Sequence, residues 1–271
     1  MCRLVPLSRV VCSLVRQLAT CVQSQRAWIQ SKTTTDQLGE EWTIDVQLRI
    51  GGGGISLFGD GAALWLTKEP FTEGEVFARE PTWTGLGLFL DTYDNAPGKH
   101  VHKHPYVSAF MSGGDHKFSY SELEADDKSL EDPAHAASRA HAGCHARLRQ
   151  YGRDPKIVTV RLSYTRSVRK LVVRLFLGRR RDQYRSAADY AWQQCFALHS
   201  VDIPPGYWLA ASASTGQLTD THEVLSIESR AKSPVELAGH LKIGRRSTDS
   251  LPLPLDGVRA STPPPPPAAR P

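Results

Sequence analysis

Long apolar runs and paired cysteine motifs are both missing from this 271-residue sequence. No apolar run approaches the roughly 18 residues that a membrane-spanning helix needs. No CxxC pair occurs, so a structural zinc site is poorly supported. Near the N-terminus, Arg9 and Arg16 interrupt the Leu/Val-rich stretch that a signal peptide would need as its apolar centre. The sequence therefore predicts neither a membrane span nor a clear signal peptide.

Nucleic-acid-binding signatures are also absent, although the formal net charge is +5. Much of the basic excess lies in Arg169–Arg185, and such a cluster can attract nucleic acid or anionic lipid. Neither an aromatic-rich RNA-binding motif nor zinc-finger spacing accompanies it. We therefore interpret this stretch as a solvated Arg-rich loop and expect no nucleic-acid partner.

A phosphate-binding loop is excluded too, because neither a GK[ST] motif nor a helix follows Gly51–Gly54. We interpret this glycine run as a flexible hairpin loop. From Trp42 onward, short apolar runs are separated mostly by Gly, Pro, Asp, Asn or Ser. In Trp42–Ile50 every second residue is apolar, which is typical of a half-buried strand. Many strands without a regular helical alternation predict an all-β fold, an antiparallel β-sandwich or jelly roll.

The same pattern indicates where the folded domain begins and ends. We expect a poorly defined segment over 1–14, a β domain over 15–230 and a disordered Pro-rich tail over 231–271. Two polar stretches inside the domain, 121–155 and 178–194, are interpreted as insertions or long loops. The second of them has room for a short helix.

Five cysteines are unevenly spaced, and three of them lie within the first 21 residues. The two in the body of the chain, Cys144 and Cys195, are compatible with two reduced core thiols or with one disulfide. The residues alone do not decide between these alternatives, so the redox compartment stays open at this point.

Three short stretches carry candidate binding chemistry. In GLGLFLDTYDN, Asp91, Tyr93 and Asn95 alternate and begin on one face as the strand ends, and their oxygen donors suit a hard cation such as Ca²⁺. In LFGDGAALW, Asp60 lies between two glycines, which allow other backbone to approach the carboxylate closely. In ASASTGQLTDTHEVLSI, a Thr-Gly-Gln-Leu turn leaves backbone N–H groups available to a ligand. Each stretch alone is also compatible with an ordinary turn.

Taken together and in this order, the three stretches resemble one family. Gly59–Trp65, Phe89–Asn95 and Ser214–His222 match motifs of the leguminous-type (L-type) lectin domain of cargo receptors and quality-control lectins in the early secretory pathway. The resemblance covers roughly 15–229. It implies a legume-lectin-like (concanavalin-like) β-sandwich with Ca²⁺ as cofactor. It also implies a non-enzymatic lectin that recognises mannose on high-mannose N-glycans.

The resemblance further implies roles for individual residues. Asp91, the Tyr93 carbonyl and Asn95 would ligate Ca²⁺, and the fixed loop would aim the Asn95 amide at a sugar hydroxyl. Asp60 would accept hydrogen bonds from other hydroxyls. Additional sugar contacts are implied for four residues, the last three through backbone groups: Ser24, Gly216, Gln217 and Leu218.

A disulfide and a compartment follow from the same resemblance. Cys144 and Cys195 match the family's paired cysteines, which favours one disulfide and an oxidising lumen. We therefore expect the lumen of the endoplasmic reticulum, the ER–Golgi intermediate compartment or the Golgi, with secretory glycoproteins as partners. Family members also carry an opening N-terminal strand and a C-terminal membrane span, and neither is clear in this sequence. Absence of the opening strand would expose a sheet edge.

The calcium loop departs from the family pattern. Ser121 and Glu122 stand where the family has Asp and a sugar-contacting His, and the family's calcium-binding Asp falls on Ala125. Either the loop is rearranged so that Asp126 or Glu124 ligates the ion, or calcium binding is weakened. Loss of the His also removes a natural pH switch.

Two other functions stay open. The altered loop is compatible with a lectin fold that has lost sugar binding and serves as a protein-interaction module. A jelly-roll glycoside hydrolase would need two carboxylates flanking the glycosidic bond, and Glu122 with Glu124 is the only tempting pair. Nothing else marks these two residues as catalytic, so we expect no enzymatic activity.

Overall fold

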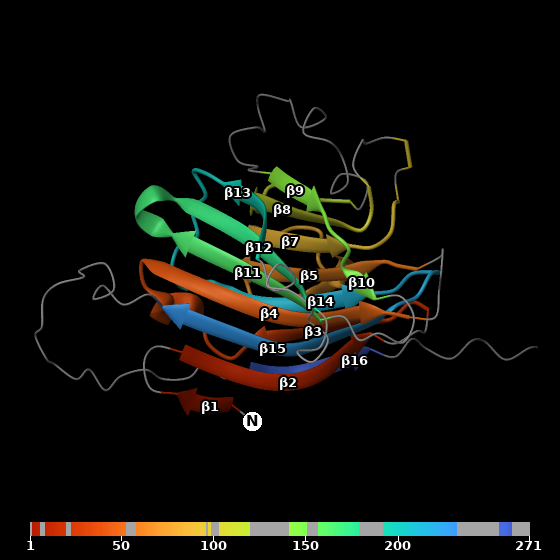
Figure 1. Ribbon diagram of the computed structural model, residues 1–271, viewed down its shortest axis with the longest axis horizontal. Helices are drawn as coiled ribbons and strands as arrows, with labels where there is room; N and C mark the ends of the chain where they lie inside the picture. Colours follow the sequence, from red (N-terminus) through yellow and green to blue (C-terminus); the bar gives the residue numbers. More distant parts are fainter. Residues whose placement is uncertain are drawn as a thin grey trace, which may run out of the picture.

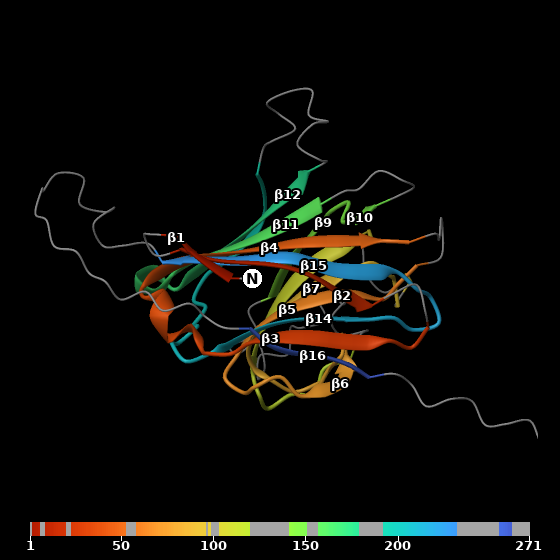
Figure 2. The same ribbon diagram turned by 90° about the horizontal axis from the view of Figure 1, so that it is seen from below.

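The computed structural model describes residues 2–5, 9–19, 23–52, 58–95, 97–98, 103–119, 141–150, 157–178, 192–231 and 255–261. Nearly all elements in these ranges are β-strands, arranged in two sheets that form two layers (Figures 1 and 2). Two short 3-10 turns, η1 (Thr35–Leu38) and η3 (Arg166–Val168), lie between strands. The predicted antiparallel β-sandwich is therefore confirmed.

The first layer, which we call the β4 sheet, has eight strands. Seven follow one another in the order β1 (Cys2–Val5), β2 (Arg9–Ala19), β15 (Thr221–Ala231), β4 (Glu41–Gly51), β11 (Ile157–Thr165), β12 (Lys170–Gly178) and β13 (Gln193–Leu198). The eighth strand, β10 (Arg149–Gln150), pairs in parallel with the end of β4, whereas the other pairings are antiparallel.

The second layer, which we call the β5 sheet, has seven strands. Their order is β16 (Leu255–Ser261), β3 (Arg26–Ser31), β14 (Trp208–Ser214), β5 (Gly61–Thr67), β7 (Thr84–Asp91), β8 (Tyr106–Gly113) and β9 (His141–His145). A short strand, β6 (Glu73–Val76), stands apart from both sheets and lies beyond the β5 sheet in Figure 2.

The core between the layers follows from the alternation of β4. The five apolar residues of Trp42–Ile50 are at most 3% exposed, whereas Thr43, Gln47 and Arg49 between them are half-buried on the outer face. Leucines and valines of β11 and β12 alternate in the same way and join the same cluster. Burial of this apolar face is the main favourable contribution to folding of such a sheet.

The β5 sheet is buried on both faces. A second apolar cluster packs on the side of this sheet that faces away from the β4 sheet. There Trp65 of β5 and Phe89 of β7 contact Phe77 and Trp83, which lie in the connection between β6 and β7. Every residue of β5 is buried as a result. Burial on both faces explains why β5 and β7 are continuous apolar runs and do not alternate.

The N-terminal segment differs from the expectation. β1 and the first part of β2 lie within 1–14, which was expected to be a poorly defined segment, and β2 pairs with β15 along most of its length. The edge of β15 that the absence of an N-terminal strand would have exposed is therefore covered by β2. A valine-rich sequence interrupted by arginines suits a strand, even though it does not suit a signal peptide.

Three other strands lie where the sequence suggested none. β16 falls within 231–271, the segment expected to be a disordered tail, and pairs with β3. β9 and β10 fall within 121–155, which was interpreted as an insertion. In each case the partner strand supplies the hydrogen-bonding backbone, which no local pattern reveals. The remaining residues of 231–271, and the region of the suggested helix at 179–191, lie outside the described residues. The boundaries 15–230 stay a prediction.

The glycine run at Gly51–Gly54 was wrongly interpreted as a hairpin loop. Gly51 ends β4 in one sheet, and the next strand along the chain, β5, belongs to the other sheet. The connection from β4 to β5 therefore crosses between the two layers and is not a hairpin, and Gly53 and Gly54 lie outside the described residues. Its local sequence could not distinguish the two cases, because both connections tolerate glycine.

Candidate functional site

Strand register in the β5 sheet brings the predicted site segments to one end of the sandwich. The start of β5 lies beside the ends of β7 and β14, since Gly61 pairs with both Asp91 and Ser214. The start of β3 lies beside the end of β14 as well, where Arg26 pairs with Ser214. The segments around Ser24, Asp60, Asp91 and Gly216 consequently converge, although they are far apart in the sequence.

Asp60 is held through its backbone at the centre of this end. Its carbonyl accepts hydrogen bonds from the Thr92 N–H and from the Thr92 hydroxyl, each at 3.0 Å. Its own N–H donates to the Ser214 carbonyl at 3.3 Å, and the Gly59–Asp60 peptide is cis. Thus Asp60 is fixed between the loop after β7 and the end of β14.

The Asp60 carboxylate lies directly against Gly216. A Cβ added to Gly216 would be 3.1 Å and 3.2 Å from the two carboxylate oxygens, so a side chain at this position would displace the carboxylate. Burial raises the pKa of Asp60 to about 6, because removal of water disfavours the charged form. A ligand that donates hydrogen bonds to the carboxylate would offset this cost.

The loop after β7 contains the candidate calcium ligands. Asp91 is 4% exposed, and its Oδ1 accepts a hydrogen bond from the Tyr93 N–H at 3.0 Å, which folds the chain into a tight turn. His104 Nε2 lies 3.9 Å from Asp91 Oδ2. Asn95 is exposed two residues further on. The structure therefore places Asp91, Tyr93 and Asn95 on one short turn beside Asp60.

The fourth predicted ligand, Asp126, lies outside the described residues, as does the whole departing loop at 120–140. Among the residues that the structure does describe, no group of three or more His, Cys, Asp or Glu side chains forms a metal cluster. The expected ligand set draws on a carbonyl and a carboxamide in addition to Asp91. Asp91 is thus the one carboxylate that this ligand set takes from the described residues.

The 215–218 turn is bound to the turn that contains Ser24. Ser24 donates its N–H to the Gly216 carbonyl at 3.0 Å, and the Gln23 side-chain amide donates to the Gln217 carbonyl at 2.9 Å. In the part of the chain that the structure describes, the N–H groups of Gly216, Gln217 and Leu218 have no acceptor. Within the described residues these N–H groups are therefore not used by the fold, and their role toward a ligand stays a prediction.

A buried ion pair behind the 215–218 turn was missed by the sequence analysis. Asp220 accepts hydrogen bonds from Arg149 Nε at 2.7 Å and from Arg149 Nη2 at 2.8 Å, and both side chains are 0% exposed. The Arg149 guanidinium also lies over the Phe58 ring, with Cζ 4.2 Å from the centroid. Asp220 stands within the quoted Ser214–His222 motif, but Arg149 lies in a segment interpreted as an insertion. Only the fold brings the two together.

His222 is buried beside this pair. It is 1% exposed, and burial is the main cause that lowers its pKa to about 4. The unfolded chain, with a pKa of about 6.5, binds the proton more readily than the folded protein between about pH 6.5 and 4. Stability from His222 is therefore complete above this window and is lost as the pH falls through it.

We expect acidification from neutral pH to pH 5 to cost about 2 kcal/mol through His222 alone. Urea unfolding at both pH values measures the loss, and His222→Asn is expected to remove this part of the pH dependence. Asp60 contributes with the opposite sign, because its raised pKa favours proton binding by the folded state. The contribution of Asp60 is the same in wild type and in His222→Asn, so it does not affect the comparison. An equal pH dependence in wild type and variant would contradict the assignment.

The predicted disulfide between Cys144 and Cys195 is present, with a Cα–Cα distance of 5.4 Å. It links β9 at one edge of the β5 sheet to β13 at one edge of the β4 sheet. The bond therefore joins the two layers of the sandwich covalently.

Loss of this disulfide is expected to destabilise the fold by about 4 kcal/mol, because it closes a loop with a sequence separation of 51. Urea unfolding of a Cys144→Ala, Cys195→Ala double variant measures the effect. Wild type unfolded under a reductant serves as the control and should match the variant. If reduction leaves the unfolding midpoint unchanged, the disulfide does not stabilise the protein.

With this geometry established, comparison with known proteins identifies the family. The model of the legume-like lectin family matches residues 11–236. The chain belongs to the legume-like lectin family. The predicted membership is confirmed, and the match includes all of the site segments described above.

Relatives of this legume-like lectin domain include two named groups. The VIP36-like protein of Mus musculus is 29% identical over 220 residues, which cover 79% of this chain and 56% of that protein. The vesicular integral-membrane protein VIP36 of Homo sapiens is 30% identical over 190 residues, which cover 70% of this chain and 46% of that protein. The chain thus spans about half the length of these relatives.

Solved structures of the VIP36 exoplasmic/lumenal domain share the fold. The Ca²⁺-bound form has a TM-score of 0.65 and 25% identity, and covers 84% of this chain and 85% of that chain. The Ca²⁺/Man2-bound form has a TM-score of 0.62 and 25% identity, and covers 85% of each. As for membrane segments, the described residues contain no helix of the length and apolarity that crossing a bilayer requires.

Proposed function

We propose that this domain is a calcium-dependent lectin that binds mannose residues of high-mannose N-glycans. The observation that carries the proposal is the convergence of three different chemical groups at one end of the β5 sheet. They are the Asp60 carboxylate, the Asp91–Tyr93 turn and the free N–H groups of the 216–218 turn. A sugar presents hydroxyls that both donate and accept hydrogen bonds, so a site of this composition suits it.

The residues of the turn after β7 fit a calcium ion. Asp91 offers a carboxylate that is almost fully buried, and burial of a carboxylate is costly unless a positive charge or donors compensate. Tyr93 would add its carbonyl and Asn95 its carboxamide oxygen, both hard donors of the kind that Ca²⁺ takes. The ion would supply positive charge and hold the loop. Asp126 is proposed as a further ligand from the sequence alone.

The sugar contacts would come from residues around this loop. Asp60 would accept hydrogen bonds from sugar hydroxyls, and its charge makes these bonds stronger than neutral ones. The amide of Asn95 and the N–H groups of Gly216, Gln217 and Leu218 would donate to sugar oxygens. Ser24 is held next to Gly216 by its backbone and would add a hydroxyl. Such a shallow set of contacts binds weakly, so several copies or glycan branches would add avidity.

The proposed setting is the lumen of the early secretory pathway, with secretory glycoproteins as partners. The disulfide between the two sheets supports an oxidising compartment. The relatives named VIP36 are vesicular integral-membrane proteins with a lumenal domain, and that domain has been solved in a metal-free form and in a form with Ca²⁺ and mannose bound. We propose that the chain sorts or retains glycoproteins and performs no chemistry on the glycan.

Calorimetric titration with an α-mannose oligosaccharide, in calcium and in a chelator, tests the proposal. Binding in calcium that disappears in the chelator supports a calcium-dependent lectin. Equal binding in both buffers would contradict the calcium dependence but not the lectin function. Absence of binding by a demonstrably folded chain would contradict both and favour a protein-interaction module. Release of sugar from a chromogenic α-mannoside would contradict the non-enzymatic assignment.

A further inference from the structure

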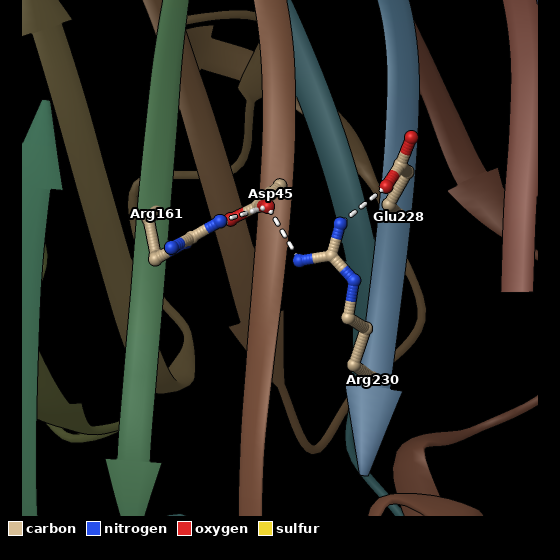
Figure 3. Close-up of polar contacts among 4 residues, drawn as sticks. All are labelled: Asp45, Arg161, Glu228 and Arg230. Atoms are coloured by element: carbon tan, nitrogen blue, oxygen red, sulfur yellow. Dashed lines mark hydrogen bonds and ion pairs between the residues drawn. The ribbon is translucent and has the colours of Figure 1, made fainter. Parts of the chain in front are cut away.

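The outer face of the β4 sheet carries a row of charges that is almost balanced. Asp45 on β4 accepts hydrogen bonds from Arg161 Nε at 2.6 Å and Arg161 Nη2 at 2.7 Å, and from Arg230 Nη1 at 2.9 Å. Arg230 also donates to Glu228 at 2.6 Å through its other nitrogen (Figure 3). Two arginines and two carboxylates therefore neutralise one another across β15, β4 and β11.

On the next strand, β12, the positive charges are not matched by carboxylates in the same way. Its Arg174 is directly opposite Arg161 in the strand register, and like charges opposite each other on neighbouring strands are unfavourable. Lys170 stands at the start of the same strand, on the same face. Neither Arg174 nor Lys170 makes an ion pair with any residue in the described ranges. Among the described residues, these two positive charges therefore have no ion-pair partner.

These cations line a hollow of about 440 Å³ on the outer face. Lys170 and Arg174 contribute positive charge to its lining, whereas Arg161 is already paired with Asp45. Thr43 and Ser163 contribute hydroxyls, and Glu41 is the one carboxylate among the lining residues. The Arg161 guanidinium also stacks on the Trp192 ring, with Cζ 4.0 Å from the ring centroid. Trp192 itself is 36% exposed. The hollow is thus polar and predominantly basic, which suits an anionic ligand.

The spacing of the cations indicates the kind of anion. Lys170 and Arg174 are four residues apart on one strand, which places them about 13 Å apart. An anion with charges spaced along its length matches two cations at this backbone spacing better than a single phosphate or carboxylate does. An extended peptide has side chains on one face at every second residue, so its carboxylates can match cations at this spacing. The hydroxyls between them can bind its polar groups.

The geometry points to a second binding site, in which the hollow over β11 and β12 binds an extended acidic segment of a partner protein. The glycan site lies at the end of the β5 sheet, whereas this hollow lies on the outer face of the β4 sheet. The two sites share no residue, so both ligands can be bound together. Such a chain would connect a glycoprotein to an acidic partner.

Fluorescence anisotropy of the full chain with a labelled peptide of alternating Glu and Thr tests this inference. We expect binding that weakens with salt, no binding of the matched peptide with Gln in place of Glu, and at least about tenfold weaker binding by a Lys170→Gln, Arg174→Gln variant. A Lys68→Gln, Lys117→Gln variant removes the same charge from exposed positions next to the β5 sheet and should bind as wild type.

Several results would overturn the inference. Equal binding of the Glu and Gln peptides would remove the role of charge, and wild-type affinity in the Lys170/Arg174 variant would place binding elsewhere. Stronger binding to phosphatidylserine vesicles or to heparin than to the peptide, lost in the same variant, would show that the partner is not an acidic protein. Competition by α-mannose oligosaccharide would show that the sites are not separate. Arg174→Gln relieves repulsion, so the melting temperature should not fall and misfolding would not explain lost binding.

Discussion

Replacement of Asp60 by asparagine is expected to weaken binding of an α-mannose oligosaccharide by about 30-fold or more. The substitution keeps the size of the side chain and removes the negative charge that strengthens hydrogen bonds from sugar hydroxyls. It also turns one acceptor into a donor, which leaves a sugar hydroxyl without its partner. The backbone contacts that hold Asp60 are unaffected, so the fold should be retained. Calorimetric titration in calcium measures the loss.

A second substitution tests the same carboxylate without removing it. Gly216→Ala places a methyl group about 3 Å from both carboxylate oxygens, which must move aside. We expect binding to weaken about tenfold in this variant. Asp115→Asn, at an exposed position after β8, is the matched control and should bind as wild type. Affinity within twofold of wild type in Asp60→Asn would contradict the proposed sugar contact.

Replacement of Asp220 by alanine is expected to lower the free energy of unfolding by about 3–5 kcal/mol. The reason is that Arg149 is 0% exposed and would remain as a buried positive charge whose carboxylate partner is gone. The pair joins the β10 segment to the end of the 215–218 turn, so the turn should also lose its fixed position. Urea unfolding measures the first effect, and mannose titration measures the second.

A double variant provides the control for this prediction. Arg149→Met with Asp220→Leu removes both charges and leaves apolar side chains of similar length in their place. Replacement of a buried ion pair by packed apolar residues costs much less than removal of one partner. We therefore expect the double variant to be more stable than Asp220→Ala. If Asp220→Ala costs less than about 1 kcal/mol, the buried pair is not a principal contribution to stability.

The site illustrates how far the sequence could be interpreted. The chemistry of Asp60, Asp91, Tyr93 and Gly216 was apparent from short motifs, because carboxylates, alternation and glycine are local features. Their convergence was implied by family resemblance and is explained by the register of β5 with β7 and β14. The role of Arg149 could not be predicted, because nothing in its neighbourhood marks it as the partner of Asp220, which is 71 residues away.

The incorrect predictions about the fold also arise because contacts between distant segments cannot be inferred from local sequence. β2 and β16 were missed because their sequences do not alternate clearly, and their pairing with β15 and β3 depends on strands far away in the chain. The glycine run after β4 was assigned to a hairpin because local composition does not show which sheet the next strand joins. In contrast, the alternation of β4 predicted its buried face correctly.

The sequence by itself determined the all-β class, the core-facing residues of β4, the family and the types of side chain at the proposed binding end. Those properties depend on periodicity and on the chemistry of neighbouring residues. Tertiary structure decided the pairing of the N- and C-terminal strands, the buried Arg149–Asp220 pair and the position of two β12 cations that have no ion-pair partner among the described residues. Each of these depends on which distant strands lie side by side, and that is set by burial and backbone hydrogen bonding over the whole sandwich.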